Sequence, residues 1–174
     1  MSKLTLGEQK ELIRLMKKMT IPAPLEVFYT WCEVFGIIAA ELVLLRYKNG
    51  KPEIFLEYRK DRFFTGWHVQ GSVELPNERI TDTLKRVIKN ELQGEVTTPK
   101  FFNWFERVKG KKNIVGFSKR GHELAFVFIA EPKKMPKETA TRKFFPLNKI
   151  PKNTIKFHAA LIKSLVPLYK NKKV

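Results

Sequence analysis

Length, composition and charge narrow the classes of protein to which this chain can belong. It has 174 residues, of which 43% are hydrophobic and 12% aromatic, so it can bury a core and is not a disordered chain. Lysine and arginine number 34 against 17 acidic residues, a formal net charge of +17. Such a charge favours polyanionic partners such as RNA, nucleotides or anionic lipid, and it says nothing about the fold. Cys32 is the only cysteine, so neither an internal disulfide nor a thiolate zinc cluster can form.

Residues 1–19 have the pattern of an amphipathic helix and not that of a signal peptide. Thr5 begins this helix and Glu8 follows three residues later, the spacing of a capping box. Its basic face could contact a membrane or nucleic acid, and we favour a helix that covers the domain with this face in solvent. We therefore predict a helical extension over 1–35, packed on a domain over 36–174. No apolar run reaches the roughly 20 residues that span a bilayer, which indicates a soluble, cytoplasmic protein.

The rest of the chain alternates strand and helix patterns. Apolar or alternating runs predict strands over 36–47, 53–59, 67–69, 101–108, 122–130 and 144–147. Asn49-Gly50 between the first two is typical of a hairpin turn. Leu84, Ile88 and Leu92 form one apolar stripe on a helix with Thr81 as N-cap, and Asn153 is expected to cap a final helix to about residue 170. This order predicts an α/β sandwich with helices on both sides of a mixed sheet.

The stretch from 67 to 96 carries the chemistry. It reads WHVQGSVELPNERITDTLKRVIKNELQGEV, a strand, a turn at Gly71-Ser72, a polar loop and a helix. Glu91 is a helical carboxylate that points at the presumed site, with Asn90 as a neutral oxygen donor and the carbonyl of Gly71 facing them. Oxygen donors of this kind suit Mg²⁺. Asp82 and Arg86 stand one helical turn apart and are expected to pair.

This stretch resembles the box of the Nudix family. That pattern is Gly, five residues, Glu, seven residues, then Arg-Glu-apolar-any-Glu-Glu-any-Gly-apolar, usually preceded by Trp-x-Leu-Pro-Gly. The matching positions are Trp67, Val69, Gly71, Glu78, Arg86, Ile88 and Glu91. Residues 143–162 are similar to the strand, proline and last helix that close many Nudix domains, so the resemblance covers roughly 36–168. It implies a Nudix-like α/β/α fold and a Mg²⁺-dependent hydrolase of a nucleoside diphosphate linked to another moiety.

Several box positions depart from the family pattern. Ser72 replaces the motif glycine, Val87 and Asn90 replace two helical glutamates, and one extra residue is expected between Leu92 and Gly94. By resemblance to the GDP-mannose mannosyl hydrolases, a Nudix branch, a single metal on Glu91 and the Gly71 carbonyl is expected. The alternative is a catalytically impaired Nudix module that binds nucleotide or RNA. A third reading is a partner-binding domain with a positive surface.

The remaining site residues leave alternatives open. Glu78 and Arg86 either take part in catalysis beside Glu91 or hold the loop and helix in shape. Residues proposed as general base are His68, His122, Glu131 and Glu138. His158 is expected to pack in the last helix. Two basic segments, 107–120 and 133–143, raise RNA or another polyanion as a partner, while a nucleotide or nucleotide sugar is the expected substrate.

Overall fold

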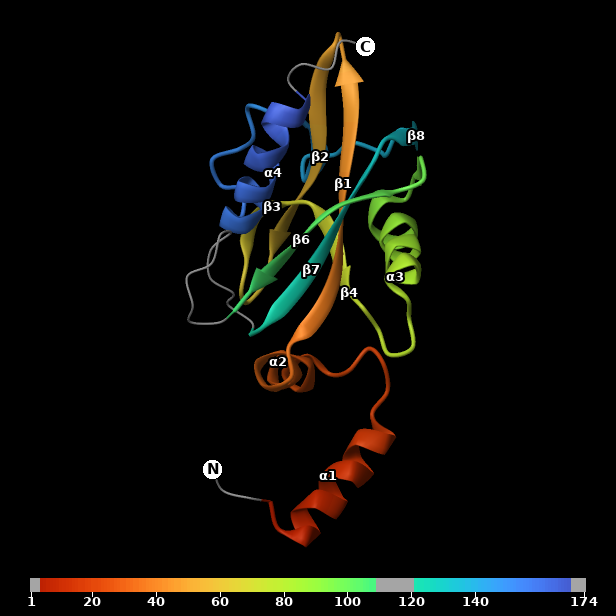
Figure 1. Ribbon diagram of the computed structural model, residues 1–174, viewed down its shortest axis with the longest axis vertical. Coiled ribbons are helices and arrows are strands. Elements are labelled where there is room, and N and C mark those ends of the chain that lie inside the picture. Colours follow the sequence, from red (N-terminus) through yellow and green to blue (C-terminus); the bar gives the residue numbers. More distant parts are fainter. Residues whose placement is uncertain (1–3, 109–120, 170–174) are drawn as a thin grey trace.

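A seven-stranded mixed sheet forms the centre of the molecule. The computed structural model describes residues 4–108 and 121–169. The main path of the sheet is β3-β2-β1-β7-β6, with β4 paired to β1 and β9 paired to β2 (Figure 1). The strands are β1 (Ile37–Lys48), β2 (Lys51–Lys60), β3 (Thr65–His68), β4 (Gln70–Val73), β6 (Lys100–Arg107), β7 (Glu123–Ala130) and β9 (Arg142–Pro146). A second, two-stranded sheet joins β5 (Glu95–Val96) to β8 (Pro132–Lys134).

Strand β1 organises the sheet because it pairs with three neighbours. It runs parallel to β7 along Ile37–Leu44 and antiparallel to β2 and β4. The turn to β2 is made by Asn49 and Gly50, both with positive φ, as a two-residue hairpin of this composition requires. The predicted mixed sheet and its first hairpin are therefore confirmed.

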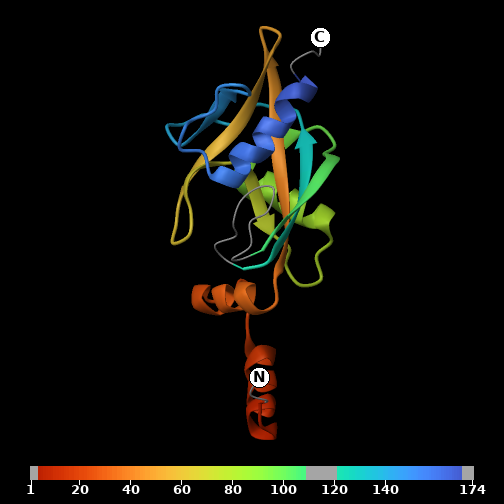
Figure 2. The same ribbon diagram turned by 60° about the vertical axis from the view of Figure 1, so that its left-hand side comes forward.

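Helices cover both faces of the sheet. Helix α3 (Ile80–Val87) lies on one face and α4 (Lys156–Tyr169) on the other, as the two views show (Figures 1 and 2). A hydrophobic core lies on each face of the sheet, and alternate residues of β1 point into the two cores. On one face, Leu42 and Leu44 pack with Leu84 and Val87 of α3. Val43 and Leu45 pack on the other side with apolar residues of α4. This period-two alternation gives the α/β/α architecture that the sequence predicts.

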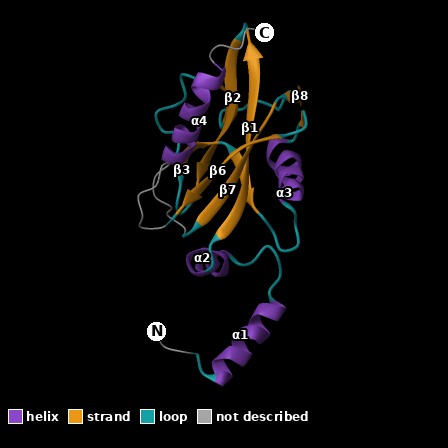
Figure 3. Cartoon of the chain, viewed as in Figure 1, coloured by secondary structure: helices purple, strands orange, loops and turns teal. Residues whose placement is uncertain are grey.

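The N-terminal segment forms two helices, α1 (Leu6–Lys18) and α2 (Leu25–Val34). Thr5 and Glu8 form the predicted capping box. Helix α2 lies across the end of the sheet, and it buries Cys32 (Figure 3). Helix α1 buries none of its residues, and its packing on the domain stays a prediction. Pro22 and Pro24 lie between the two helices, and α2 is the part of the predicted extension that lies at the end of the sheet (Figure 3).

Three local expectations also need correction. Gly71-Ser72 is part of strand β4 and not a turn, because it pairs with β1. Arg79 is the N-cap of α3 in place of Thr81. Helix α4 begins at Lys156, and the carbonyl of Asn153 instead accepts the N–H of Trp67. Of the basic segment 107–120, residues 109–120 lie outside the described residues. Among those that are described, no helix is long and apolar enough to cross a membrane.

Candidate functional site

Strand β4 brings a glycine and a helical carboxylate together. The backbone N–H of Gly71 donates to Glu91 Oε2 at 3.0 Å. Both polar groups of a strand residue point to the same edge, so the Gly71 carbonyl lies on this edge of β4 too. A Cβ at position 71 would lie 2.9 Å from the Ala40 carbonyl oxygen and 3.1 Å from Glu41 Cγ, so this close approach requires glycine. Glu91 and Gly71, predicted as partners from the sequence, are therefore neighbours.

A π-helical turn, η1 (Ile88–Leu92), carries Glu91. The N–H of Gln93 donates to the Ile88 carbonyl, which is one residue wider than an α-turn. The extra residue expected after Leu92 is therefore accommodated within this turn. Gln93, and not Gly94, adopts the left-handed conformation, with φ 53°. It occupies the position at which the resemblance places a closing glycine.

Burial raises the pKa of Glu91 to about 7, and the charge of Glu57 acts in the same direction. The hydrogen bond from Gly71 and the charges of Arg59 and Arg86 oppose this shift. A half-buried carboxyl with a pKa near neutral pH, in contact with a residue that lines a cavity, is a typical functional group. Glu57 and Arg59 were missed as site residues. Their positions two residues apart on a predicted strand were the signal that could have placed both on one face of β2.

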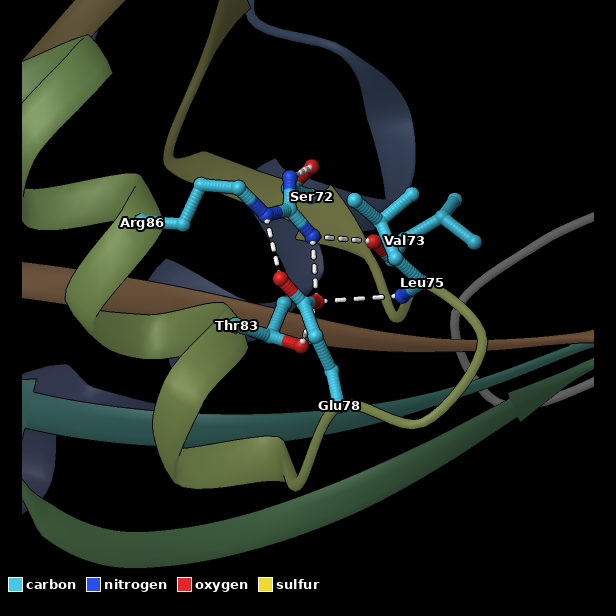
Figure 4. A network of polar contacts seen from close by, with 6 residues as sticks. All are labelled: Ser72, Val73, Leu75, Glu78, Thr83 and Arg86. Carbon is cyan, nitrogen blue, oxygen red and sulfur yellow. Dashed lines mark hydrogen bonds and ion pairs between the residues drawn. The ribbon is translucent and has the colours of Figure 1, made fainter. Parts of the chain in front are cut away.

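Glu78 and Arg86 hold the β4–α3 loop against the helix (Figure 4). The guanidinium of Arg86 binds both oxygens of Glu78, at 2.8 and 2.7 Å. It also donates to Ser72 Oγ and to the Val73 carbonyl. The hydrogen bond from Arg86 lowers the pKa of Glu78 to about 2, so this carboxylate stays ionised. Asp82 pairs with Lys85 and not with Arg86, since Glu78 already occupies the guanidinium.

The departures from the box change the donors that could hold a metal. Val87 is buried in the core beneath α3, where the family pattern has a carboxylate. Asn90 is exposed and lines the cavity, so its oxygen is a neutral donor. Among the described residues, no three His, Cys, Asp or Glu side chains group as metal ligands. Glu91, Asn90 and the Gly71 carbonyl are hard oxygen donors with one carboxylate between them, a set that fits one hydrated Mg²⁺.

A cavity of about 970 Å³ adjoins this edge of β4. The segment leading into α2, the beginning of β1, strand β4 and the loop that carries Glu78 line it. Gly71, Arg86 and Asn90 are among the lining residues, as is Arg59 of β2. The cavity is large enough for a ligand of nucleotide size.

Part of the cavity lining belongs to a buried polar cluster that the sequence did not reveal. Arg107 donates to Glu41 at 3.1 Å and to Glu123 at 2.5 Å. His158 Nε2 lies 3.3 Å from the same Glu41 oxygen, and His68 stacks on His158 with 5.7 Å between ring centroids. These residues come from five elements, and all are buried. His158, expected to pack only, therefore also makes a polar contact.

The candidates for general base lie in different parts of the molecule. His68 lines the cavity. His122 is exposed and lies 2.8 Å from Glu106. Glu138 pairs with Arg46, and Glu131 is exposed just after β7. Of the four, only His68 is among the lining residues of the cavity, and burial lowers its pKa to about 3, so its imidazole is neutral.

Comparisons with known proteins support the fold. No protein-family model matches the chain, and no curated protein matches it. Solved structures that contain a Nudix domain do match the chain in fold. The NUDIX domain of Shewanella oneidensis NrtR, complexed with ADP ribose, is 15% identical, with a TM-score of 0.58 over 76% of this chain and 87% of that one.

Two further structures agree. A possible asymmetric diadenosine tetraphosphate hydrolase from Jonesia denitrificans is 14% identical, with a TM-score of 0.64 over 82% of this chain and 99% of that one. A MutT/nudix family protein from Enterococcus faecalis is 16% identical, with a TM-score of 0.53 over 97% and 76%. The chain therefore has the Nudix fold.

Proposed function

From the Nudix fold we propose that this chain is a hydrolase of a nucleoside diphosphate linked to another moiety, and that it acts with a single Mg²⁺. The observation that carries the proposal is the position of Glu91, whose carboxylate accepts a hydrogen bond from the N–H of Gly71, a residue that lines the cavity. A similar structure is complexed with ADP ribose, which is a compound of this class.

The residues that would hold the metal are Glu91, Asn90 and the carbonyl of Gly71. When bound, Mg²⁺ supplies charge neutralisation at the diphosphate and activation of the attacking water. Glu91 must be ionised to act as a ligand, and its raised pKa makes this carboxylate a group that titrates near neutral pH. Glu78 and Arg86 act as positioning residues, because their bonds to each other and to β4 fix the loop beside Gly71.

The test is hydrolysis of ADP-ribose, GDP-mannose and capped RNA with Mg²⁺, comparing the wild type with Glu91→Gln. The amide keeps an acceptor for the Gly71 N–H and removes the charge. We expect kcat/KM to fall at least about 100-fold for the compound that is turned over, about 3 kcal/mol of lost transition-state stabilisation. Glu95→Gln is the matched control, because this exposed carboxylate does not line the cavity. Unchanged turnover in Glu91→Gln would rule out the single-metal proposal.

A catalytically impaired module that binds nucleotide or RNA is the second candidate. The observation that favours it is the replacement of two box carboxylates by buried Val87 and neutral Asn90. In that case the protein would bind ADP-ribose or RNA in EDTA without product formation. RNA binding through the basic surface would also weaken steeply with salt.

A further inference from the structure

The buried cluster beside the cavity has more charge than a packed core requires. Glu41 of β1, His68 of β3, Arg107 of β6, Glu123 of β7 and His158 of α4 meet in it. Burying ions is costly even when they are paired, and buried ion pairs are weak contributors to stability. Four of these residues, all but Arg107, also line the cavity, so a role in ligand binding is a direct explanation of their presence.

One oxygen of Glu41 is open to a ligand. Oε1 is bound by both Arg107 and His158. Oε2 has no hydrogen-bond partner among the described residues. It is also not one of the fully buried polar atoms that lack a partner, so this oxygen is accessible to solvent. Because Glu41 is about 95% buried and lines the cavity, this oxygen faces the cavity itself.

The charge on this oxygen selects the kind of group it can bind. The buried guanidinium of Arg107 lies 3.1 Å from Glu41 Oε1, and this ion pair favours the carboxylate form of Glu41. A carboxylate accepts hydrogen bonds and repels phosphate. Burial keeps the neighbouring imidazole of His68 neutral, so that it can accept or donate. Hydroxyl groups fit this pair, and phosphate oxygens do not.

The place of Glu41 relative to Gly71 suggests which hydroxyl groups these are. The two residues are register partners on β1 and β4, so their Cα atoms are roughly 5 Å apart. The ribose of a nucleotide is the group directly attached to its diphosphate. A diphosphate held at the edge of β4 near Gly71 would therefore place its ribose within reach of Glu41.

We propose that Glu41 and His68 form a ribose subsite, in which Glu41 Oε2 accepts hydrogen bonds from the vicinal 2′- and 3′-hydroxyl groups. Arg107, Glu123 and His158 are positioning residues that hold Glu41 from behind. The inference rests on the proposed function, since it assumes that a nucleoside diphosphate occupies the cavity.

The experiment compares the Kd of ADP with that of 2′,3′-dideoxy-ADP by calorimetry, with inorganic pyrophosphate as a probe that has no ribose. In the wild type we expect the dideoxy compound to bind roughly 10- to 100-fold more weakly, the range for hydrogen bonds to a charged group. In Glu41→Gln the ratio of the two Kd values should fall toward one while pyrophosphate binding is unchanged. Glu106→Gln is the matched control, because this exposed carboxylate on β6 does not line the cavity and should keep the wild-type ratio.

His68→Gln covers the case in which Glu41→Gln fails to fold, because His68 is outside the ion pairs of Arg107. This variant should also reduce the ratio. Equal wild-type binding of the two ADP compounds would overturn the subsite and leave the proposed function standing. A wild type that binds neither ADP compound nor pyrophosphate would overturn both. A wild-type ratio of the two Kd values in Glu41→Gln would also overturn the ribose subsite. If only His68→Gln folds, a wild-type ratio in that variant would do the same.

Discussion

Glu91 combines a polar contact with an environment that disfavours its charge. Its pKa is raised to about 7 in the fold, mainly by burial, against an ordinary value of 4.5. A raised carboxyl pKa means that the folded state binds a proton more tightly than the unfolded state. The stability this provides is complete below about pH 4.5 and is lost as pH rises through about 7.

Glu91→Gln should therefore remove a pH dependence. We expect the variant to match the wild type at pH 4.5 and to exceed its free energy of unfolding by about 2 kcal/mol at pH 8, because the amide has no charge to bury. Urea unfolding across this range measures the difference. If the free energy of unfolding of the wild type does not fall relative to that of the variant between pH 5 and 8, the burial of Glu91 is contradicted.

Arg86 and Glu78 should behave as one unit. Arg86→Met and Glu78→Gln each leave a partner without its counter-charge, so we expect each to lower the free energy of unfolding by about 2 kcal/mol. The double variant should cost less than the sum, with a coupling of about 1–2 kcal/mol in a double-mutant cycle. Additive effects would show that the contacts in Figure 4 do not stabilise the loop. Asp82→Asn on the same helix, where Asp82 forms an ion pair with the exposed Lys85, serves as the control.

At the scale of elements, the π-helical turn is the unusual feature, because it ends on a non-glycine residue with positive φ. Gln93 has φ 53° and is exposed, so its side chain contributes little packing to offset the backbone strain. Gln93→Gly should raise the free energy of unfolding by about 0.5–1 kcal/mol, since glycine adopts this conformation without strain. Thermal unfolding measures the change. Gln9→Gly, in the regular helix α1, should give no such gain.

Some elements and contacts could be predicted from the sequence, and others could not. Asn49-Gly50 and the apolar runs of β1 and β7 predicted the sheet, because turn chemistry and hydrophobic periodicity are local signals. The approach of Gly71 to Glu91 followed from the strand–loop–helix pattern. The pairing of Glu41 with Arg107 joins residues 66 positions apart, and no local pattern encodes such a contact. Strand β4 was missed because its four residues contain glycine and serine, which are typical of turns.

At the scale of the whole molecule, the first two helices differ in how closely they contact the sheet domain. Helix α1 is exposed over all its residues, whereas α2 buries Cys32 and binds Arg62 through Glu26. Deleting residues 1–18 should change the free energy of unfolding by less than about 1 kcal/mol, because none of the residues of α1 is buried. Deleting residues 1–34 should cost about 2 kcal/mol or more, because it uncovers the end of the sheet. Comparable losses in the two truncations would show that α1 packs on the domain after all.

The central claim is that one Mg²⁺, held through Glu91, supports hydrolysis of a nucleoside diphosphate derivative in this cavity. The most direct measurement is the dependence of kcat/KM on Mg²⁺ concentration for the wild type and for Glu91→Gln. We expect wild-type activity to rise hyperbolically, as for one bound ion, and the variant to need far more Mg²⁺ and to stay at least about 100-fold less active. Turnover that is independent of Mg²⁺, that rises cooperatively with it, or that is equal in the two proteins would contradict the claim.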